Sequence, residues 1–107
     1  MTELETVASV PGVSAAVLGD LEGTFLGALR TGEGETIAAE MGVVGSTLQE
    51  VGETLGLGAL ASCSISGRTN ACLLLVRPPA LITALITPPQ SLGPVERAVD
   101  TAFQDWT

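Results

Sequence analysis

The sequence contains no histidine, no lysine and no tyrosine, and its only cationic side chains are four arginines. Without histidine the chain has no imidazole to act as a base or a metal ligand. Without lysine it has neither a phosphate-loop lysine nor a Schiff-base amine. The carboxylates of Asp100 and Asp105 lie on the polar side of an expected helix, with no supporting acid or base pocket. We therefore expect no enzyme activity, no catalytic residue and no cofactor.

Positive charge is scarce as well, since twelve acidic residues give the chain a net charge of −8. Such a surface repels the phosphates of nucleic acids and the headgroups of anionic lipids. No apolar run approaches the roughly 20 residues that a membrane-spanning helix requires. Residues 1–5 are acidic, where a secretory signal carries positive charge. We expect a cytoplasmic protein that neither binds nucleic acid nor inserts into a membrane.

Apolar residues are abundant. They make up 46% of the 107 residues, whereas charged residues make up 15%. This balance is typical of a folded globule and excludes a disordered chain. A chain of this length is large enough to bury one core and too short for two. Residues 1–107 are therefore expected to form a single domain.

Two helices are indicated in the first half of the chain. Thr2 and Glu5 have the spacing of a capping box, which begins a short helix that Pro11 ends. Further on, apolar residues recur every three or four positions across residues 37–55. This periodicity predicts a long amphipathic helix, and Gly56 suits the left-handed position after its end.

Five other segments have the short apolar or alternating pattern of β-strands. An acidic turn at residues 20–23, a two-residue turn at residues 67–68 and proline pairs at residues 78–79 and 88–89 separate or end them. The strands are expected at residues 13–19, 24–29, 60–66, 71–76 and 81–86.

A last helix follows Ser91, whose side chain is placed to cap it. The order of elements is then α-ββ-α-βββ-α, and its hairpin connections require antiparallel pairing. We expect an α+β fold: a five-stranded antiparallel sheet, a long helix on one face and helices at both ends. The apolar stripe of the last helix comprises Leu92, Val95, Val99, Ala102, Phe103 and Trp106.

The two cysteines, Cys63 and Cys72, would lie directly opposite each other if residues 67–68 form the whole turn. That register raises the question of a disulfide. Cytosolic thiols are normally reduced, however, and two thiolates without histidine are too few for a metal site. We expect buried, reduced cysteines and no bound metal.

Three further features resemble functional motifs but have simpler explanations. Asp20 and Glu22 alternate before a glycine as in a calcium loop, yet the rest of the ligand set is missing, which favours a hairpin turn. The glycines of residues 32–35 could cradle a phosphate, but the two flanking carboxylates would repel it. The aromatic residues are scattered, which favours core packing over a ligand cage. They are Phe25, Phe103 and Trp106.

Four short segments occur in an order and spacing that resemble the Roadblock (dynein light chain) family. They are Val-Pro-Gly-Val at residues 10–13, Asp-Leu-Glu-Gly at 20–23, Leu-Gly-Leu-Gly at 55–58 and Ser-Leu-Gly-Pro-Val at 91–95. Each alone is only a turn or a cap, but chance explains all four poorly. The resemblance covers nearly the whole chain.

This resemblance implies a sheet that dimerises through its long middle helix and third strand, and a platform that binds small Ras-like GTPases or larger assemblies. Some prokaryotic relatives activate or scaffold a small GTPase by shaping it rather than by inserting catalytic groups. The resemblance therefore implies no active-site chemistry, and no catalytic residue is carried over.

The expected middle helix has an aliphatic stripe and beside it a stripe of small residues that includes Gly42, Gly45 and Gly52. Three glycines inside a helix cost roughly 3 kcal/mol relative to alanine, which a close backbone contact should offset. That contact is either with the chain's own sheet or with a second copy, and the resemblance favours the second copy.

The third strand presents a polar face that contains Leu60 and alternate serines. This face is either solvated or lies at an edge that pairs with a symmetry mate. From the helix and this strand together we predict a dimer interface made by Ile37, Met41, Val44, Gly45, Leu48, Val51, Leu60, Ser62 and Ser64.

The leading hypothesis is a non-catalytic interaction module, a homodimer that binds and regulates or scaffolds a small Ras-like GTPase. The first alternative is a structural adaptor that joins a larger complex without affecting GTPase turnover. The second alternative is a small-molecule sensor, although the sequence offers few polar groups to line a pocket.

Overall fold

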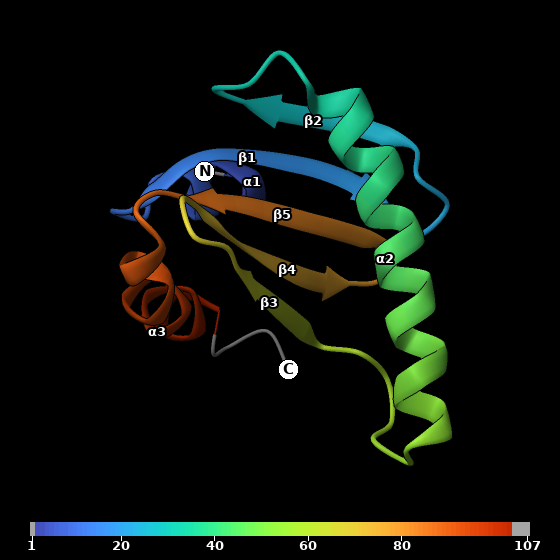
Figure 1. Ribbon diagram of the computed structural model, residues 1–107. Helices are drawn as coiled ribbons and strands as arrows, with labels where there is room; N and C mark the ends of the chain where they lie inside the picture. The colour runs from blue at the N-terminus through green and yellow to red at the C-terminus, as the bar shows by residue number, and fades with distance from the viewer. Residues whose placement is uncertain (1, 104–107) are drawn as a thin grey trace.

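The computed structural model describes residues 2–103 of the chain (Figure 1). The order of helices and strands agrees with the sequence prediction, and the fold is α+β. The elements are α1 (Glu3–Ala8), β1 (Val13–Asp20), β2 (Phe25–Leu29), α2 (Gly34–Thr54), β3 (Ser62–Ser66), β4 (Ala71–Arg77), β5 (Ala80–Ile86), a 3-10 turn η1 (Pro89–Ser91) and α3 (Leu92–Ala102).

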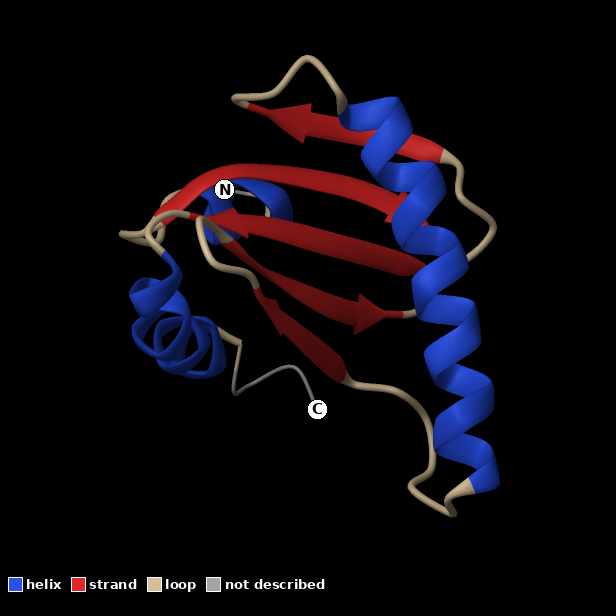
Figure 2. Cartoon of the chain, in the orientation of Figure 1, coloured by secondary structure: helices blue, strands red, loops and turns tan. Residues whose placement is uncertain are grey.

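The five strands form one sheet in the order β2-β1-β5-β4-β3, and all neighbouring strands are antiparallel (Figure 2). The β1–β2 hairpin joins the β3–β4–β5 meander through the pairing of β1 with β5. Strands β2 and β3 therefore lie at the two edges. Within residues 2–103 neither edge has a further strand beside it.

Helices cover both faces of the sheet: α2 crosses one face, and α1 and α3 lie on the other (Figure 1). On the α1 and α3 side, Val7, Val95 and Val99 pack against Ile82 and its neighbours in the sheet to form the larger core. On the α2 side the smaller core is formed by Leu74, Val76 and Leu81, with Leu21, Met41, Val44, Leu60 and Cys63 packed against it.

Helix α1 begins as the sequence predicts. The Thr2 hydroxyl accepts a hydrogen bond from the Glu5 amide at 3.2 Å, and the Thr2 amide donates to the Glu5 carboxylate at 3.3 Å. Together these bonds satisfy two donors that a helix start leaves free. They also lower the pKa of Glu5, first through the backbone bond and then through the hydroxyl bond, because both favour the ionised carboxylate.

Helix α2 packs on the sheet through a stripe of buried small residues, and this corrects the favoured interpretation of that stripe. They are Gly34, Ala38, Gly42, Gly45 and Gly52. A Cβ added at Gly42 would lie 2.6 Å from the backbone nitrogen of Gly23, in the β1–β2 turn. One added at Gly45 would lie 3.2 to 3.3 Å from Leu21 and Leu81. The close contact that offsets the cost of these glycines is therefore made within the chain.

The end of α2 follows the prediction closely. Gly56 has a φ of 72°, in the left-handed region that glycine adopts without strain. The amide of Leu57 then donates to the carbonyl of Gly52 at 2.8 Å, which closes the helix end.

Two local predictions were wrong. The connection between β3 and β4 has four residues, 67–70, because Ser66 pairs with Ala71 and the Gly67 amide donates to the Asn70 carbonyl at 2.8 Å. Ser91 makes no side-chain capping bond, since the preceding 3-10 turn already leads the chain into α3. Trp106, assigned to the stripe of the last helix, lies outside the described residues.

None of the helices between residues 2 and 103 combines the length and apolarity needed to span a bilayer.

Candidate functional site

The aliphatic stripe of α2 lies beside its buried glycine face, at the edge of the contact with the sheet. Ile37, Met41, Val44 and Leu48 are half-buried. Further along the helix the same stripe is progressively more exposed, with Val51 46% and Leu55 65% accessible. The C-terminal half of α2 projects past the sheet near β3, so these apolar side chains have little cover (Figure 1).

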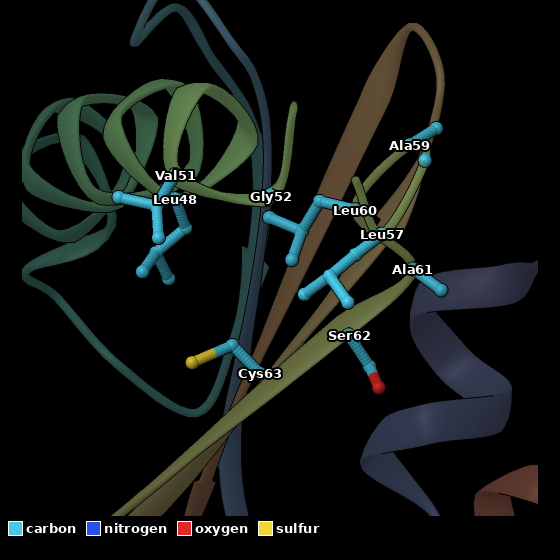
Figure 3. A pocket seen from close by; sticks show the side chains of 10 residues that line it. Leu48, Val51, Gly52, Leu57, Ala59, Leu60, Ala61, Ser62 and Cys63 are labelled. Carbon is cyan, nitrogen blue, oxygen red and sulfur yellow. The ribbon is translucent and has the colours of Figure 1, made fainter. Parts of the chain in front are cut away.

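A hollow of about 330 Å³ lies between this half of α2 and the segment that leads into β3. Figure 3 shows Leu48 and Val51 on the helix facing Leu57 and Leu60 on the connecting segment. Cys63 points toward the same space, whereas Ser62 points to the other side of the strand (Figure 3). The hollow is therefore lined mainly by aliphatic side chains and offers few groups that could form hydrogen bonds to a ligand.

Strand β3 continues this surface to the edge of the sheet. Cys63 packs against the α2-side core, and Ile65, two residues further, is 47% exposed on the same side. Ser62, Ser64 and Ser66 alternate with them and are exposed. The edge of β3 thus has an apolar side that continues α2 and a polar side made of serines.

The structure brings most of the predicted interface residues to this region. Ile37, Met41, Val44, Leu48, Val51 and Leu60 lie along the stripe or beside the hollow, and Ser62 and Ser64 lie on the edge strand. Leu60 differs from the prediction, because it precedes β3 and packs on the α2 side instead of sharing the serine face. Gly45 also differs, because it is buried against Leu21 and Leu81 of its own chain.

Three apolar residues of this surface were missing from the predicted interface: Leu55, Leu57 and Ile65. Leu55 continues the stripe by helical spacing and could have been included from the sequence. Ile65 is the one strongly apolar residue among alternating serines, a pattern that indicates a strand side distinct from the serine side. Leu57 follows a helix end, where periodicity gives no signal.

The cysteines are free, half-buried and not directly opposite each other. Because the turn has four residues, Cys63 pairs with Leu74 and Cys72 pairs with Ile65. The two thiols therefore share one side of the sheet as diagonal neighbours. Burial raises the pKa of the Cys72 thiol, and the nearby Cys63 raises it further.

The other candidate motifs serve local structure. The Asp20 carboxylate accepts hydrogen bonds from the amides of Glu22 and Thr24, both at 2.9 Å, and so holds the β1–β2 turn. Among residues 2–103 no group of three or more cysteine, aspartate or glutamate side chains could hold a metal ion. Phe25 was expected in the core but is 39% exposed, since β2 is an edge strand, whereas Phe103 packs against the larger core as expected.

No protein-family model matches the sequence, and no curated protein matches it. Solved structures do resemble the fold. MglB of Myxococcus xanthus is 11% identical with a TM-score of 0.80, over 94% of this chain and 85% of that chain. A Roadblock/LC7 domain from Streptomyces avermitilis is 15% identical with a TM-score of 0.73, over 95% of this chain and 91% of that chain. An MglB structure with a tetrameric arrangement is 17% identical with a TM-score of 0.72, over 92% of this chain and 80% of that chain. The chain therefore has a Roadblock-type fold.

Proposed function

We propose that this protein is a non-catalytic interaction module that forms a homodimer through α2 and β3 and binds a small Ras-like GTPase in the cytoplasm. The observation that carries the dimer is the exposed apolar surface on three neighbouring parts of the chain: the exposed end of the α2 stripe, the hollow beside it and the apolar side of β3. The proposal that the partner is a GTPase rests on the Roadblock-type fold and on the function that the family resemblance implies.

The apolar side chains exposed on this surface would be buried in a dimer, and this supports the proposed interface. Val51, Leu55, Leu57 and Ile65 are large and exposed, and they lie on α2, the loop that follows it and β3. Each fully buried aliphatic side chain contributes about 1.5–3 kcal/mol relative to an exposed one. Among residues 2–103 no strand covers the outer edge of β3, so this edge adds backbone donors and acceptors that a second strand can pair with.

The charges of α2 are compatible with such a contact. Between Gly34 and Thr54 the helix carries Glu35, Glu40, Glu50 and Glu53 and no basic residue. At 100° per residue, three of these carboxylates fall on the side of the helix away from the aliphatic stripe, and only Glu40 lies near it. Two copies can therefore approach through the stripe while most of their negative charge stays in solvent.

The same charges would remain on the outer surface of the dimer, where a GTPase could bind. The sequence has no lysine or histidine, so the module itself supplies few groups for transition-state chemistry. Its effect on a GTPase would then come from the shape that binding imposes on the GTPase. A structural adaptor would bind a partner without changing its turnover.

Light scattering tests the dimer with a matched pair of variants on one helix. Val51→Glu places a charge in the stripe, whereas Val43→Glu places one on the outer side of α2, where Val43 is 68% exposed. We expect the native protein and Val43→Glu to have twice the 10.8 kDa mass of one chain, and Val51→Glu to be a folded monomer. A native monomer, or a dimer unaffected by Val51→Glu, contradicts this interface.

Binding to a Ras-like GTPase purified from the source organism tests the partner. Calorimetry with the GTPase bound to a non-hydrolysable GTP analogue should show saturable binding, and phosphate release should change when the module is added. Binding without a change in phosphate release identifies an adaptor, and no binding to any such GTPase removes this partner class.

A further inference from the structure

The two cysteines lie on one side of the sheet, and the register of the β3–β4 hairpin keeps them apart. Cys63 pairs with Leu74 and Cys72 pairs with Ile65, so the two cysteines are diagonal neighbours. The Cα atoms of diagonal neighbours are roughly 7–8 Å apart, whereas a disulfide needs a Cα separation of about 4.4–6.8 Å. In the observed register a bond between the two thiols therefore requires the backbone to move.

A slide of β3 by two residues along β4 removes this obstacle. The slide places Cys63 directly opposite Cys72, at the Cα separation of about 4.5–5.5 Å that paired residues have. Because side chains alternate with a period of two, every residue of β3 stays on its own side of the sheet. The connection shortens from residues 67–70 to Gly67 and Arg68, and glycine at the first position suits a two-residue hairpin turn.

The contacts of β3 offer little resistance to this slide. The strand lies at the edge of the sheet and, within residues 2–103, pairs only with β4 (Figure 2). Its side chains are exposed apart from that of Cys63, which is half-buried. The Thr87 hydroxyl donates to the side-chain oxygen of Asn70 at 2.7 Å, but this bond holds the start of β4 and does not involve β3. A shift of β3 therefore loses little buried surface.

A hollow of about 270 Å³ between α3 and the β3–β4 pair receives a side chain that the slide moves. Apart from Ser62, Arg77 and Asp100, the residues that line this hollow are apolar. The slide carries Leu60 into the position that Ser62 now has, opposite Leu75. Leu60 then leaves the α2-side core and enters this hollow on the opposite face. Apolar burial lost on one face is thereby replaced on the other.

We propose that Cys63 and Cys72 form a redox switch, in which a disulfide between them locks β3 in the register shifted by two residues. The oxidant is a low-molecular-weight disulfide such as oxidised glutathione. The Cys63 thiolate attacks one sulfur of this disulfide and releases the first thiolate; the Cys72 thiolate then attacks the Cys63 sulfur and releases the second. Two protein thiols are oxidised, one disulfide is reduced to two thiols, and the two protein protons pass to the leaving thiolates.

The switch acts on the proposed α2 and β3 dimer surface, and this consequence alone rests on the proposed function. The slide withdraws Leu60 from the α2 side and moves Cys63 and Ile65 about 7 Å along the edge of the sheet. Oxidation should therefore raise the dissociation constant of the dimer by at least about tenfold. The register and the disulfide belong to each subunit, so both can be measured whether or not the protein dimerises.

Oxidation of the native protein in a glutathione buffer tests the switch. After quenching with iodoacetamide, the intact chain should be lighter by its two thiol hydrogens and carry neither label nor glutathione. In NMR spectra the cross-strand contacts of Ser64 should move from Leu73 to Ala71, and Leu60 should gain contacts with Phe103. Glutathione adducts alone, no disulfide, or a disulfide that leaves Ser64 opposite Leu73 overturns the proposal.

A matched double variant separates the slide from the disulfide itself. Ile65→Cys combined with Cys63→Ser places a thiol directly opposite Cys72 in the observed register. This variant should form a disulfide in the same buffer while Ser64 stays opposite Leu73. Light scattering should show that oxidation dissociates the native dimer and leaves the mass of the variant unchanged. Equal dissociation of both, or of neither, contradicts the coupling of register to the dimer. A native protein that is monomeric when reduced removes the proposed dimer, whereas the NMR contacts still decide the switch.

Discussion

Gly42 in the middle of α2 lies against Gly23 in the β1–β2 turn, backbone to backbone. A Cβ at position 42 would come within 2.6 Å of the Gly23 nitrogen and 2.7 Å of its Cα. Gly23 itself has a φ of 86°, a left-handed conformation that suits glycine. The Ser46 hydroxyl donates to the Leu21 carbonyl at 2.9 Å and ties the same turn to the helix. The turn thus fixes where α2 crosses the sheet.

Gly42→Ala should therefore destabilise the protein, although alanine favours the helix by about 1 kcal/mol. The added methyl group would meet backbone atoms that cannot rotate away, and overpacking of this kind costs typically about 1–3 kcal/mol. Gly52→Ala is the matched control, since its Cβ would meet only the Gly58 carbonyl oxygen at 3.4 Å. Urea unfolding at one protein concentration should show a loss for Gly42→Ala and a small gain for Gly52→Ala. Equal effects would contradict the contact.

The sequence alone could predict the order of elements because each has a local signal. The capping box of Thr2 and Glu5, the periodicity of residues 37–55 and the left-handed Gly56 depend on residues close in the chain, and all are present in the structure. Sheet order is less local. The pairing of β1 with β5 joins segments about 70 residues apart, and no short motif encodes it.

The wrong predictions for the β3–β4 turn and for Gly45 have a common physical cause. The spacing of residues in the sequence does not determine strand register or which surface a helix face packs against. Gly67 and Arg68 fit a two-residue turn, but the chain continues to Asn70 before β4 begins, which moves Cys63 by two positions along its partner strand. Similarly, the helical pattern showed that Gly45 lies on a small-residue stripe but could not show whether that stripe meets the sheet or another chain. Both outcomes bury small residues equally well.

In the observed β3–β4 register, Cys63 and Cys72 have different roles in a cross-linking test of the proposed dimer. If two β3 strands pair antiparallel about their middle residue, Ser64, the two Cys63 side chains become diagonal neighbours roughly 7–8 Å apart. The two Cys72 side chains, on β4, would be three strand spacings apart across the sheet and offset by two residues along it, which separates them by about 16 Å. A short bis-maleimide should therefore link native protein and Cys72→Ser into dimers, but not Cys63→Ser. Linking of Cys63→Ser with the native yield would exclude this strand pairing.

The raised pKa of Cys72 predicts a slow thiol reaction at neutral pH. Burial and the neighbouring Cys63 both disfavour the thiolate, which is the reactive form. In the Cys63→Ser variant Cys72 is the only thiol. We expect iodoacetamide to react with Cys72 more slowly than with N-acetylcysteine at pH 7.5. The increase in reaction rate with pH should occur at a higher pH for Cys72 than for N-acetylcysteine. Unfolding in urea should remove the difference. A rate equal to that of N-acetylcysteine in the folded protein contradicts this environment.

The Thr2 and Glu5 capping box makes a pH-dependent contribution to α1, whose sign follows from the lowered pKa of Glu5. A carboxyl with a folded pKa below its unfolded value stabilises the fold above the unfolded pKa, and this stabilisation is lost as pH falls through the folded pKa. The usual value is 4.5, so Glu5→Gln should be less stable than native at pH 7, and the difference should shrink below about pH 4. Glu3→Gln, in the same turn but outside the capping box, is the control and should change less at pH 7.

Thr2→Ala, which removes the hydroxyl acceptor, should lower the free energy of unfolding by about 1 kcal/mol at pH 7. Urea unfolding of the native protein and the three variants at pH 7 and pH 3.5 measures these differences. A Glu5→Gln deficit that persists undiminished at pH 3.5 would show that the carboxylate charge is not what holds the start of α1.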